Sequence, residues 1–401
     1  MSDTLSHCSF CTKHKDQVGK LIVSHTVAIC NECIELCNNL LKDAKQSSKK
    51  NSKEKDAPDP RTIRDYLDQY VVGQDTAKIV LAVGIANHYK RINNPDATRE
   101  IAKGNILMIG PTGTGKTLMA RSVARYLDVP FVVADATTLT EAGYVGDDVE
   151  SLIARLYTAA DNDVARCQRG IIFLDEVDKI SRKSESSTVS KDVSGEGVQQ
   201  ALLKLVEGTK CKIIPQGSRK QATSDGIEID TTNILFIAGG AFIGLENIIK
   251  TRVQGTSMGF GAQLSTPIDG NLTAVTPDDL VSYGLIPEFV GRFANYVSLH
   301  SLSKSQLISI LTEVQHNFVG QYKWLFDQDG VELAFDADSL DLIADRTLKT
   351  KTGARGLHSE LERVLLPHMF DLLRYKTANI LNVTINKTQV NTPMTLLQEN
   401  L

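Results

Sequence analysis

The most informative segment of this chain is Ile106-Leu-Met-Ile-Gly-Pro-Thr-Gly-Thr-Gly-Lys-Thr117. Four apolar residues run into a glycine-rich loop, and residues 116–127 then repeat apolar side chains at helical spacing. The glycines let backbone N–H groups surround phosphate oxygens, and the N-terminus of the helix adds its positive dipole end. A glycine-rich loop of this spacing between a strand and a helix predicts an ATP-binding phosphate loop.

Two side chains of this loop have assigned roles in the prediction. Lys116 is expected to reach the β- and γ-phosphates, and the hydroxyl of Thr117 to ligate Mg²⁺. The residues predicted to contact the nucleotide along the loop are Gly110, Pro111, Thr112, Gly113, Thr114, Gly115, Lys116, Thr117 and Leu118.

A second acidic element follows in Ile171-Ile-Phe-Leu-Asp-Glu176, where two carboxylates come directly after an apolar strand. Ligands bind at the carboxyl ends of strands in parallel sheets, so these acids are expected beside the phosphate loop. Asp175 suits Mg²⁺ through water, and Glu176 suits the polarisation of the attacking water. Asp178 is interpreted as a solvated or capping acid and receives no role.

Apolar runs alternate with helical stretches through the middle of the chain. The predicted strands are 106–109, 131–134, 171–174, 234–238 and 296–299, and several are continuously apolar, as in strands covered on both faces. This alternation predicts an α/β fold with a mostly parallel sheet and right-handed crossovers. After residue 300 the pattern changes to amphipathic helices over 303–326, 336–347 and 355–374, with short strands at 331–334 and 380–383 and no pattern from residue 386 onward.

The composition limits the class of protein. The chain has 401 residues, so two or three domains are expected. Its formal net charge of −4 gives no indication of a basic surface that would bind nucleic acid or an anionic membrane. No apolar run has the length of a membrane span, and the first residues resemble neither a secretory signal nor a transit peptide. We therefore expect a reducing, cytoplasmic compartment.

Five of the seven cysteines lie in the first 37 residues. Cys8-x2-Cys11 and Cys30-x2-Cys33 have the spacing of a four-thiolate zinc site, which a short chain segment needs in order to fold. Cys37 is left over. A polar stretch follows, so the predicted domains are a zinc-binding domain at 1–41, a linker at 42–60, a large ATPase domain at 61–300, a small helical domain at 301–386 and a tail at 387–401.

Together these motifs resemble the AAA+ ATPases, and specifically the ClpX family of protein unfoldases. The resemblance extends from the cysteine cluster to about residue 385. The segments that carry it are Gly110-Pro-Thr-Gly-Thr-Gly-Lys-Thr117, Phe173-Leu-Asp-Glu-Val-Asp-Lys179, Asp192-Val-Ser-Gly-Glu-Gly-Val-Gln-Gln-Ala-Leu-Leu-Lys204, Gly284-Leu-Ile-Pro-Glu-Phe-Val-Gly-Arg292 and Thr352-Gly-Ala-Arg-Gly-Leu357. The resemblance implies an AAA+ P-loop NTPase with a five-stranded sheet, a small helical C-terminal domain and an N-terminal zinc domain that dimerises and recruits adaptors or substrates.

The resemblance also implies further site residues. Arg292 would be the arginine finger that reaches ATP bound to a neighbouring subunit, and Arg355 would contact nucleotide in its own subunit. Val71 and Val72 would be apolar walls for the adenine. A trans-acting arginine makes hydrolysis depend on assembly, and the family implies a homo-hexamer. One departure is at the end of the fourth strand, where Ala238-Gly-Gly240 replaces a polar sensor residue, so no sensor side chain is assigned there.

Three loops carry further implications of the resemblance. Tyr144 and Val145 would grip substrate polypeptide in the axial pore, with residues 181–192 as a second pore loop. Arg219-Lys-Gln221 stands where the family has Arg-Lys-His, which puts substrate preference at the pore entrance in doubt. The tripeptide Met258, Gly259 and Phe260 would dock into clefts of a ClpP-type peptidase, because an exposed apolar tripeptide needs a partner surface.

The leading prediction is an ATP-dependent unfoldase that translocates protein substrates into a ClpP-type peptidase. The alternatives are a remodelling chaperone that works without the peptidase, a nucleic-acid-acting AAA+ motor, and a non-enzymatic zinc-dependent adaptor. The expected cofactors are ATP, Mg²⁺ and Zn²⁺, and neither nucleic acid nor membrane is an expected partner. The sequence shows no proteolytic constellation, so any peptide cleavage is expected to come from the partner.

Overall fold

The computed structural model describes residues 6–24, 27–38, 57–94, 101–140, 147–182, 195–213, 226–255 and 272–392. The chain divides into two compact units, Met1–Asp56 and Ala57–Leu401, and each is described by itself. Within the described ranges, no helix combines the length and apolarity needed to cross a bilayer.

The second unit is built on a five-stranded sheet in the order β11-β3-β10-β7-β4, in which every neighbouring pair is parallel. Its strands are β3 (Asn105–Ile109), β4 (Phe131–Asp135), β7 (Ile171–Asp175), β10 (Leu235–Gly240) and β11 (Phe293–Ser298). These include all five predicted strands, which confirms the α/β fold with a parallel sheet. Phe293 and Asn295 pair with successive residues of β3, so a bulge lies at the start of β11.

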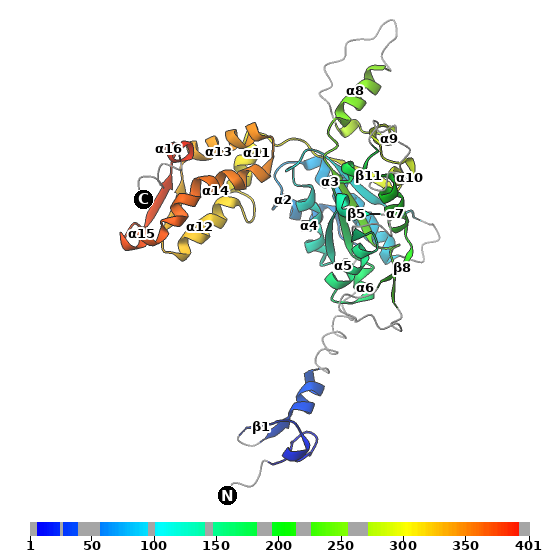
Figure 1. Cartoon of the computed structure of the whole chain (residues 1–401), viewed down its shortest axis with the longest axis vertical. Coiled ribbons are helices and arrows are strands. Elements are labelled where there is room, and N and C mark those ends of the chain that lie inside the picture. The colour runs from blue at the N-terminus through cyan, green and yellow to red at the C-terminus, as the bar shows by residue number, and fades with distance from the viewer. Residues whose placement is uncertain are drawn as a thin grey trace. The chain divides into compact units, whose positions relative to one another are not determined.

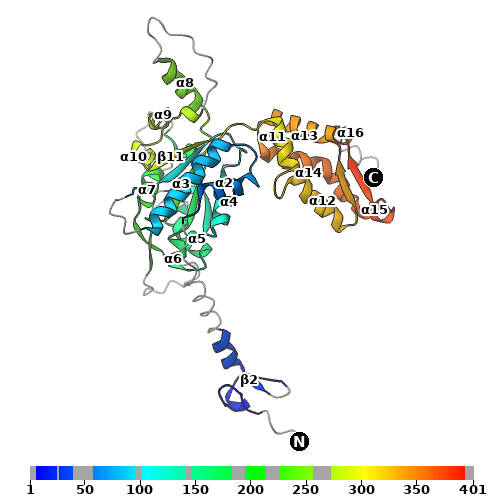
Figure 2. The same cartoon turned by 180° about the vertical axis from the view of Figure 1, so that it is seen from behind.

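The continuously apolar strands are explained by a separate core on each face of the sheet. Leu107 and Ile109 of β3 pack into one cluster, whereas Ile106 and Met108 pack into the other. Helix α3 crosses the second face and lies in front of the sheet in Figure 2. Since successive side chains of a strand point to opposite faces, a strand covered on both sides must be apolar at every position.

The helices around this sheet have the following bounds: α2 Pro60–Asp68, α3 Asp75–Asn93, α4 Lys116–Leu127, α5 Ser151–Ala159, α6 Val164–Cys167, α7 Glu196–Glu207, α8 Leu245–Gly255, α9 Pro277–Tyr283 and α10 Pro287–Val290. Short 3₁₀ turns occur at η2 Ala136–Thr138, η3 Val177–Ile180 and η4 Leu272–Ala274. The small strands β5 (Leu139–Thr140) and β6 (Asp147–Asp148) pair in parallel, and β8 (Lys210–Ile213) and β9 (Ile227–Asp230) form an antiparallel pair.

The C-terminal part of this unit packs its helices around a third core (Figure 1). Its elements are α11 Lys304–Thr312, α12 Phe318–Gln328, β12 Glu332–Phe335, α13 Ala337–Thr350, α14 Ala354–Phe370, α15 Leu372–Thr377, β13 Asn382–Ile385 and α16 Lys387–Asn391. The two strands pair in parallel.

Three sequence predictions for this part need correction. The helix predicted over 303–326 is two helices, because His316 has a left-handed φ of 62° and Asn317 caps the start of α12 through the N–H of Gly320. The helix predicted over 355–374 is interrupted at Asp371, between α14 and α15. The segment after residue 386 also forms a helix, α16, whose Val390 is fully buried and whose first turn carries a capping box.

The first unit is a small zinc-finger-like module. Strands β1 (Leu21–Val23) and β2 (Ala28–Cys30) pair antiparallel, η1 covers Lys15–Gln17, and residues 31–38 are helical. Its buried cluster consists of Cys8, Cys30 and Cys33 with a few partly buried apolar neighbours. So small an apolar core needs a further cross-link to hold the fold together.

Candidate functional site

The phosphate loop connects β3 to α4, as its sequence predicts. Gly110, Gly113 and Gly115 have φ angles of 156°, 75° and 101°, so two of them adopt the left-handed backbone that glycine tolerates best. A Cβ at Gly113 would lie 2.2 Å from the carbonyl oxygen of Thr352. The loop therefore leaves no room for a side chain at Gly113.

Lys116 and Thr117 begin α4 and face the second acidic element. The ammonium of Lys116 donates to the carbonyls of Gly110 (2.6 Å) and Pro111 (3.0 Å). Burial lowers the pKa of Lys116 to about 8, although the carboxylates of Asp175 and Asp178 act in the opposite direction. The hydroxyl of Thr117 donates to Asp175 Oδ2 at 3.1 Å. This pairing of a hydroxyl with a carboxylate at the head of a phosphate loop is the donor set that Mg²⁺ takes in such sites, so the residues fit the ion.

Glu176 and Asp178 follow β7 at the edge of the same site. Glu176 is exposed, has a left-handed φ of 57°, and donates its N–H to Asp175 Oδ1 at 3.0 Å. Asp178 is 3% exposed, so its interpretation as a solvated acid is wrong. Its Oδ1 accepts the N–H of Ala241 at 3.1 Å, and its Oδ2 lies 3.1 Å from Lys179 Nζ.

The position of Asp178 explains why a small residue ends β10. A Cβ on Gly240 would lie 2.8 Å from Asp178 Oδ1 and 2.6 Å from the ring of Phe242. The carboxylate of Asp178 thus occupies the space that a side chain at the end of β10 would need. Asp178 lines the cavity, but the sequence analysis gave it no role. Its position three residues after Asp175 was the feature of the sequence that could have indicated a place in the site.

A cavity of about 580 Å³ brings the predicted nucleotide residues together. Val71, Val72, Glu176 and Arg355 line it along with residues 112–118 of the phosphate loop. Gly110 and Pro111 do not line it and instead present their carbonyls to Lys116. Further lining residues to which the sequence analysis assigned no role include Tyr70, Arg121, Arg125, Asp178, Lys179, Ile243, Ile310, Val314, His316 and Phe318.

Residues Ile310, Val314 and Phe318 come from the C-terminal helical part, which therefore closes one side of the cavity. The two parts also meet at the phosphate loop itself. Ala354, the first residue of α14, donates its N–H to the carbonyl of Gly113 at 3.0 Å. Ile310 belongs to α11, Val314 to the connection that follows it and Phe318 to the start of α12, so the break between the two helices brings these side chains to the cavity.

Arg292 lies apart from this cavity, directly before β11. Its Nη2 is 2.5 Å from Glu207 Oε1, and both side chains are partly exposed. Among the described residues, three predicted nucleotide-site residues do not line the cavity: Gly110, Pro111 and Arg292.

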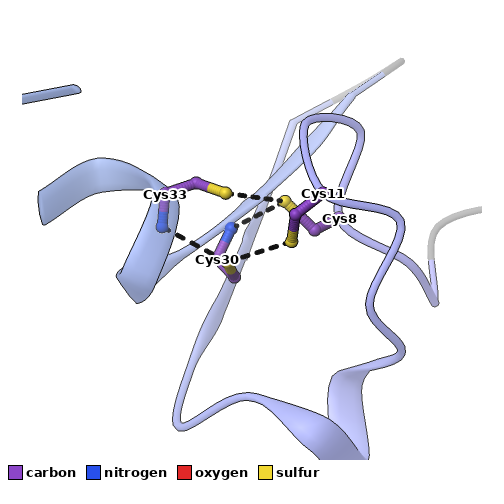
Figure 3. Close-up of side chains that lie close together, drawn as sticks. All are labelled: Cys8, Cys11, Cys30 and Cys33. Carbon is purple, nitrogen blue, oxygen red and sulfur yellow. Dashed lines mark hydrogen bonds between the residues drawn. The ribbon is translucent and has the colours of Figure 1, made fainter. Parts of the chain in front are cut away.

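The four predicted zinc ligands converge in the first unit (Figure 3). Their sulfurs all lie within 4.8 Å of one another, with Cys8 and Cys33 at 3.9 Å and Cys11 and Cys30 at 3.7 Å. A tetrahedron with Zn–S bonds of about 2.3 Å requires sulfurs about 3.8 Å apart. The N–H groups of Cys30 and Cys33 donate to the sulfurs of Cys8 and Cys30, at 3.3 and 3.4 Å. The donor set and its spacing fit Zn²⁺.

Other predicted residues lie outside the described ranges. They are the pore-loop residues Tyr144 and Val145, most of the second pore loop at 181–192, Arg219, Lys220 and Gln221, and the docking tripeptide Met258, Gly259 and Phe260.

Comparisons with known proteins give matches to the cysteine-rich first unit, to the part built on the parallel sheet and to the C-terminal helical part. Residues 6–43 match the family described as ClpX C4-type zinc finger, and residues 101–296 match AAA domain (Cdc48 subfamily). Residues 302–384 match the C-terminal, D2-small domain of ClpB protein. A protein of Treponema denticola named ATP-dependent Clp protease ATP-binding subunit ClpX is 46% identical over 371 residues, which is 91% of this chain and 89% of that protein.

The phosphate loop, the acidic strand end and the cysteine cluster thus occur in a chain that matches one relative along nearly its whole length. The chain therefore belongs to the ClpX family, and it is an AAA+ ATPase that uses ATP with Mg²⁺ and holds Zn²⁺ in a four-cysteine finger.

Proposed function

We propose that this protein assembles into a hexameric ring, hydrolyses ATP, and uses that energy to unfold protein substrates and pass them to a ClpP-type peptidase. The observation that carries the proposal is the nucleotide cavity, in which the phosphate loop, Glu176 and Arg355 face one space of about 580 Å³. The family to which the chain belongs supports the partner, since its Treponema denticola relative is named as a subunit of the Clp protease.

Within the cavity, each side chain has a distinct task. Lys116 binds the β- and γ-phosphates, while Arg355 contacts the nucleotide from α14. Glu176 orients the attacking water and accepts its proton, and its exposed position at the end of β7 leaves it accessible to that water. Mg²⁺, held through Thr117 and Asp175, would neutralise charge on the phosphates.

The adenine would lie against Val71 and Val72, which line the same cavity. Arg292 would reach ATP in a neighbouring subunit, which fits its position outside the cavity of its own chain. Hydrolysis would then depend on ring assembly. Tyr144 and Val145 would grip substrate in the pore, and Met258, Gly259 and Phe260 would dock to the peptidase.

The zinc unit would recruit adaptors or substrates. All five cysteines of this unit, the four of the zinc site and Cys37, are unbridged thiols. This fits a reducing compartment, and we infer a cytoplasmic protein. A nucleic-acid motor is the second candidate, but the formal net charge of −4 gives it little support.

The decisive experiment measures ATP turnover and loss of a tagged, stably folded protein, with and without a ClpP-type peptidase. We expect ATP-dependent loss of the tagged protein only when both proteins are present. Glu176→Gln should abolish turnover while ATP still binds, because only the base that activates water is lost. Tyr144→Ala should weaken unfolding more than ATP turnover.

Two results would contradict the proposal. Full ATP turnover in Glu176→Gln would remove the assigned base. Unfolding at full coupling in Tyr144→Ala would remove the pore-loop mechanism and reopen the nucleic-acid alternative, which stimulation of turnover by single-stranded DNA would then support.

A further inference from the structure

The backbone at Arg292 is fixed by a buried amide on the neighbouring strand, β3. Asn105, 1% exposed at the start of β3, donates through Nδ2 to the carbonyls of Arg292 (3.0 Å) and Val206 (3.3 Å). Its Oδ1 accepts the N–H of Phe236 at 3.2 Å. One side chain thus joins the end of α7 and the start of β11, and a buried amide with these bonds satisfied strongly resists displacement.

Helix α7 supports the same turn at its other end. Gln199, fully buried, accepts the N–H of Ile286 and donates to the carbonyl of Ile180, both at 2.8 Å. Ile286 caps α10, and the N–H of Arg292 returns to the carbonyl of Phe289 in that helix at 3.1 Å. The turn that presents Arg292 is therefore attached to α7 at two separate points.

The last residue of α7 then contacts the arginine side chain. Glu207 Oε1 lies 2.5 Å from Arg292 Nη2, with the two side chains 37% and 50% exposed. A pair this exposed contributes little to the stability of the fold. It does, however, fix one edge of a planar guanidinium, which has five N–H donors and can bind a second anion with the others.

We propose that Glu207 is a positioning residue for Arg292, holding one edge of its guanidinium so that the remaining N–H groups face the nucleotide of the neighbouring subunit. The inference rests on the proposed function, in which Arg292 acts in that neighbour's site. An unpaired arginine side chain would lose rotamer freedom each time it met the phosphates. Glu207 restricts those rotamers beforehand, which is the advantage of a preorganised catalytic group.

Mixed rings separate this role from a structural one. The acceptor subunit carries Arg292→Ala and keeps its own ATP site; the donor subunit carries Glu176→Gln and keeps Arg292. Each subunit alone should be nearly inactive. In a mixture, turnover arises where ATP in an acceptor meets Arg292 of a donor.

Glu207→Gln is then introduced into one subunit at a time. In the donor it should lower turnover of the mixture about twofold to fivefold, the range expected for loss of one partly exposed ion pair. In the acceptor, which has no Arg292 to position, it should act no more strongly than the matched control Glu228→Gln, which removes the exposed pair between Glu228 and Lys210. Glu207→Asp in the donor should restore part of the loss.

Three results would overturn the inference. Turnover that is unchanged or raised by Glu207→Gln in the donor would show that the carboxylate does not orient the arginine. An equal loss from either subunit would indicate a structural role. A mixture no more active than its separate components would refute the trans action of Arg292 itself, and the proposal for Glu207 with it.

Discussion

Lys116 is the buried cation of the nucleotide cavity, and its positive charge should strengthen phosphate binding. In the free protein, burial disfavours the charged form and lowers its pKa to about 8. Lys179, which lines the same cavity, differs because its hydrogen bond to Asp178 raises its pKa. The two lysine pKa values therefore shift in opposite directions, because Lys116 is buried and Lys179 is hydrogen-bonded to a carboxylate.

We predict that kcat/KM for ATP falls as pH rises through about 8, because the free enzyme then loses the Lys116 charge. Below that pH the ammonium is charged and phosphate binding is fully supported. The kcat value should fall only at a higher pH, since bound phosphates hold the proton on the amine. Steady-state rates between about pH 7 and pH 9.5 test this. A kcat/KM that stays constant over the whole range would contradict the assignment.

At the scale of elements, the contact between the phosphate loop and the start of α14 links two parts of the second unit. Gly353 has φ 60° and ψ −150°, a region essentially restricted to glycine. A Cβ there would lie 2.7 Å from the carbonyl oxygen of Thr112 and 2.8 Å from that of Gly113. Arg355, which lines the cavity, is the residue next to Ala354, whose N–H makes this backbone contact with Gly113.

We predict that Gly353→Ala raises KM for ATP about tenfold, since the added methyl displaces either the phosphate loop or α14. Gly330→Ala is the matched control. Gly330 also has a positive φ, 76°, but a Cβ there would meet nothing within 4 Å. The control should lose about 1 kcal/mol of unfolding free energy and leave KM unchanged. The KM for ATP and the thermal unfolding of both variants are measured. An equal KM in the two variants would argue against a role of the contact between the phosphate loop and α14 in ATP binding.

At the scale of the whole molecule, the two units depend on different forces. The first unit has few buried side chains other than cysteines, whereas the second has two apolar clusters around its sheet and one in its helical part. A metal that binds only the folded form stabilises that form, so zinc should be part of the folding free energy of the first unit alone.

We predict that a zinc chelator unfolds the first unit and leaves the thermal transition of the second, and its shift with ATP, unchanged. Cys30→Ser should lose bound Zn²⁺, whereas Cys37→Ser should keep it because Cys37 lies outside the cluster. Metal content and calorimetry of the two variants provide the measurement. Loss of zinc in Cys37→Ser would contradict the prediction. So would a lower unfolding temperature of the second unit after chelation, because zinc would then stabilise more than the first unit.

Elements with local signals could be predicted from the residues alone. The phosphate loop, the strand before Asp175 and the cysteine pairs could be predicted because the chemistry needs fixed residue types at fixed spacing. The five strands were also visible. Burial on both faces makes residues 106–109, 171–174 and 235–238 apolar at every position, whereas β4 and β11 are only partly buried and were recognised from the apolar residues within 131–134 and 296–299. The break before α12 and the helix α16 were missed, because each depends on a single cap residue and on burial against distant helices.

Which distant residues share a site depends on how the folded elements pack against one another. The burial of Asp178 depends on the close approach of the end of β10, and the fixing of Arg292 depends on Asn105 and Glu207, which are far from it in sequence. Periodicity reports whether a side chain faces a core or solvent, but it carries no information about which element lies opposite. Which elements lie opposite each other is set by the order of strands in the sheet and by the packing of α7, so these contacts could be identified only from the folded structure.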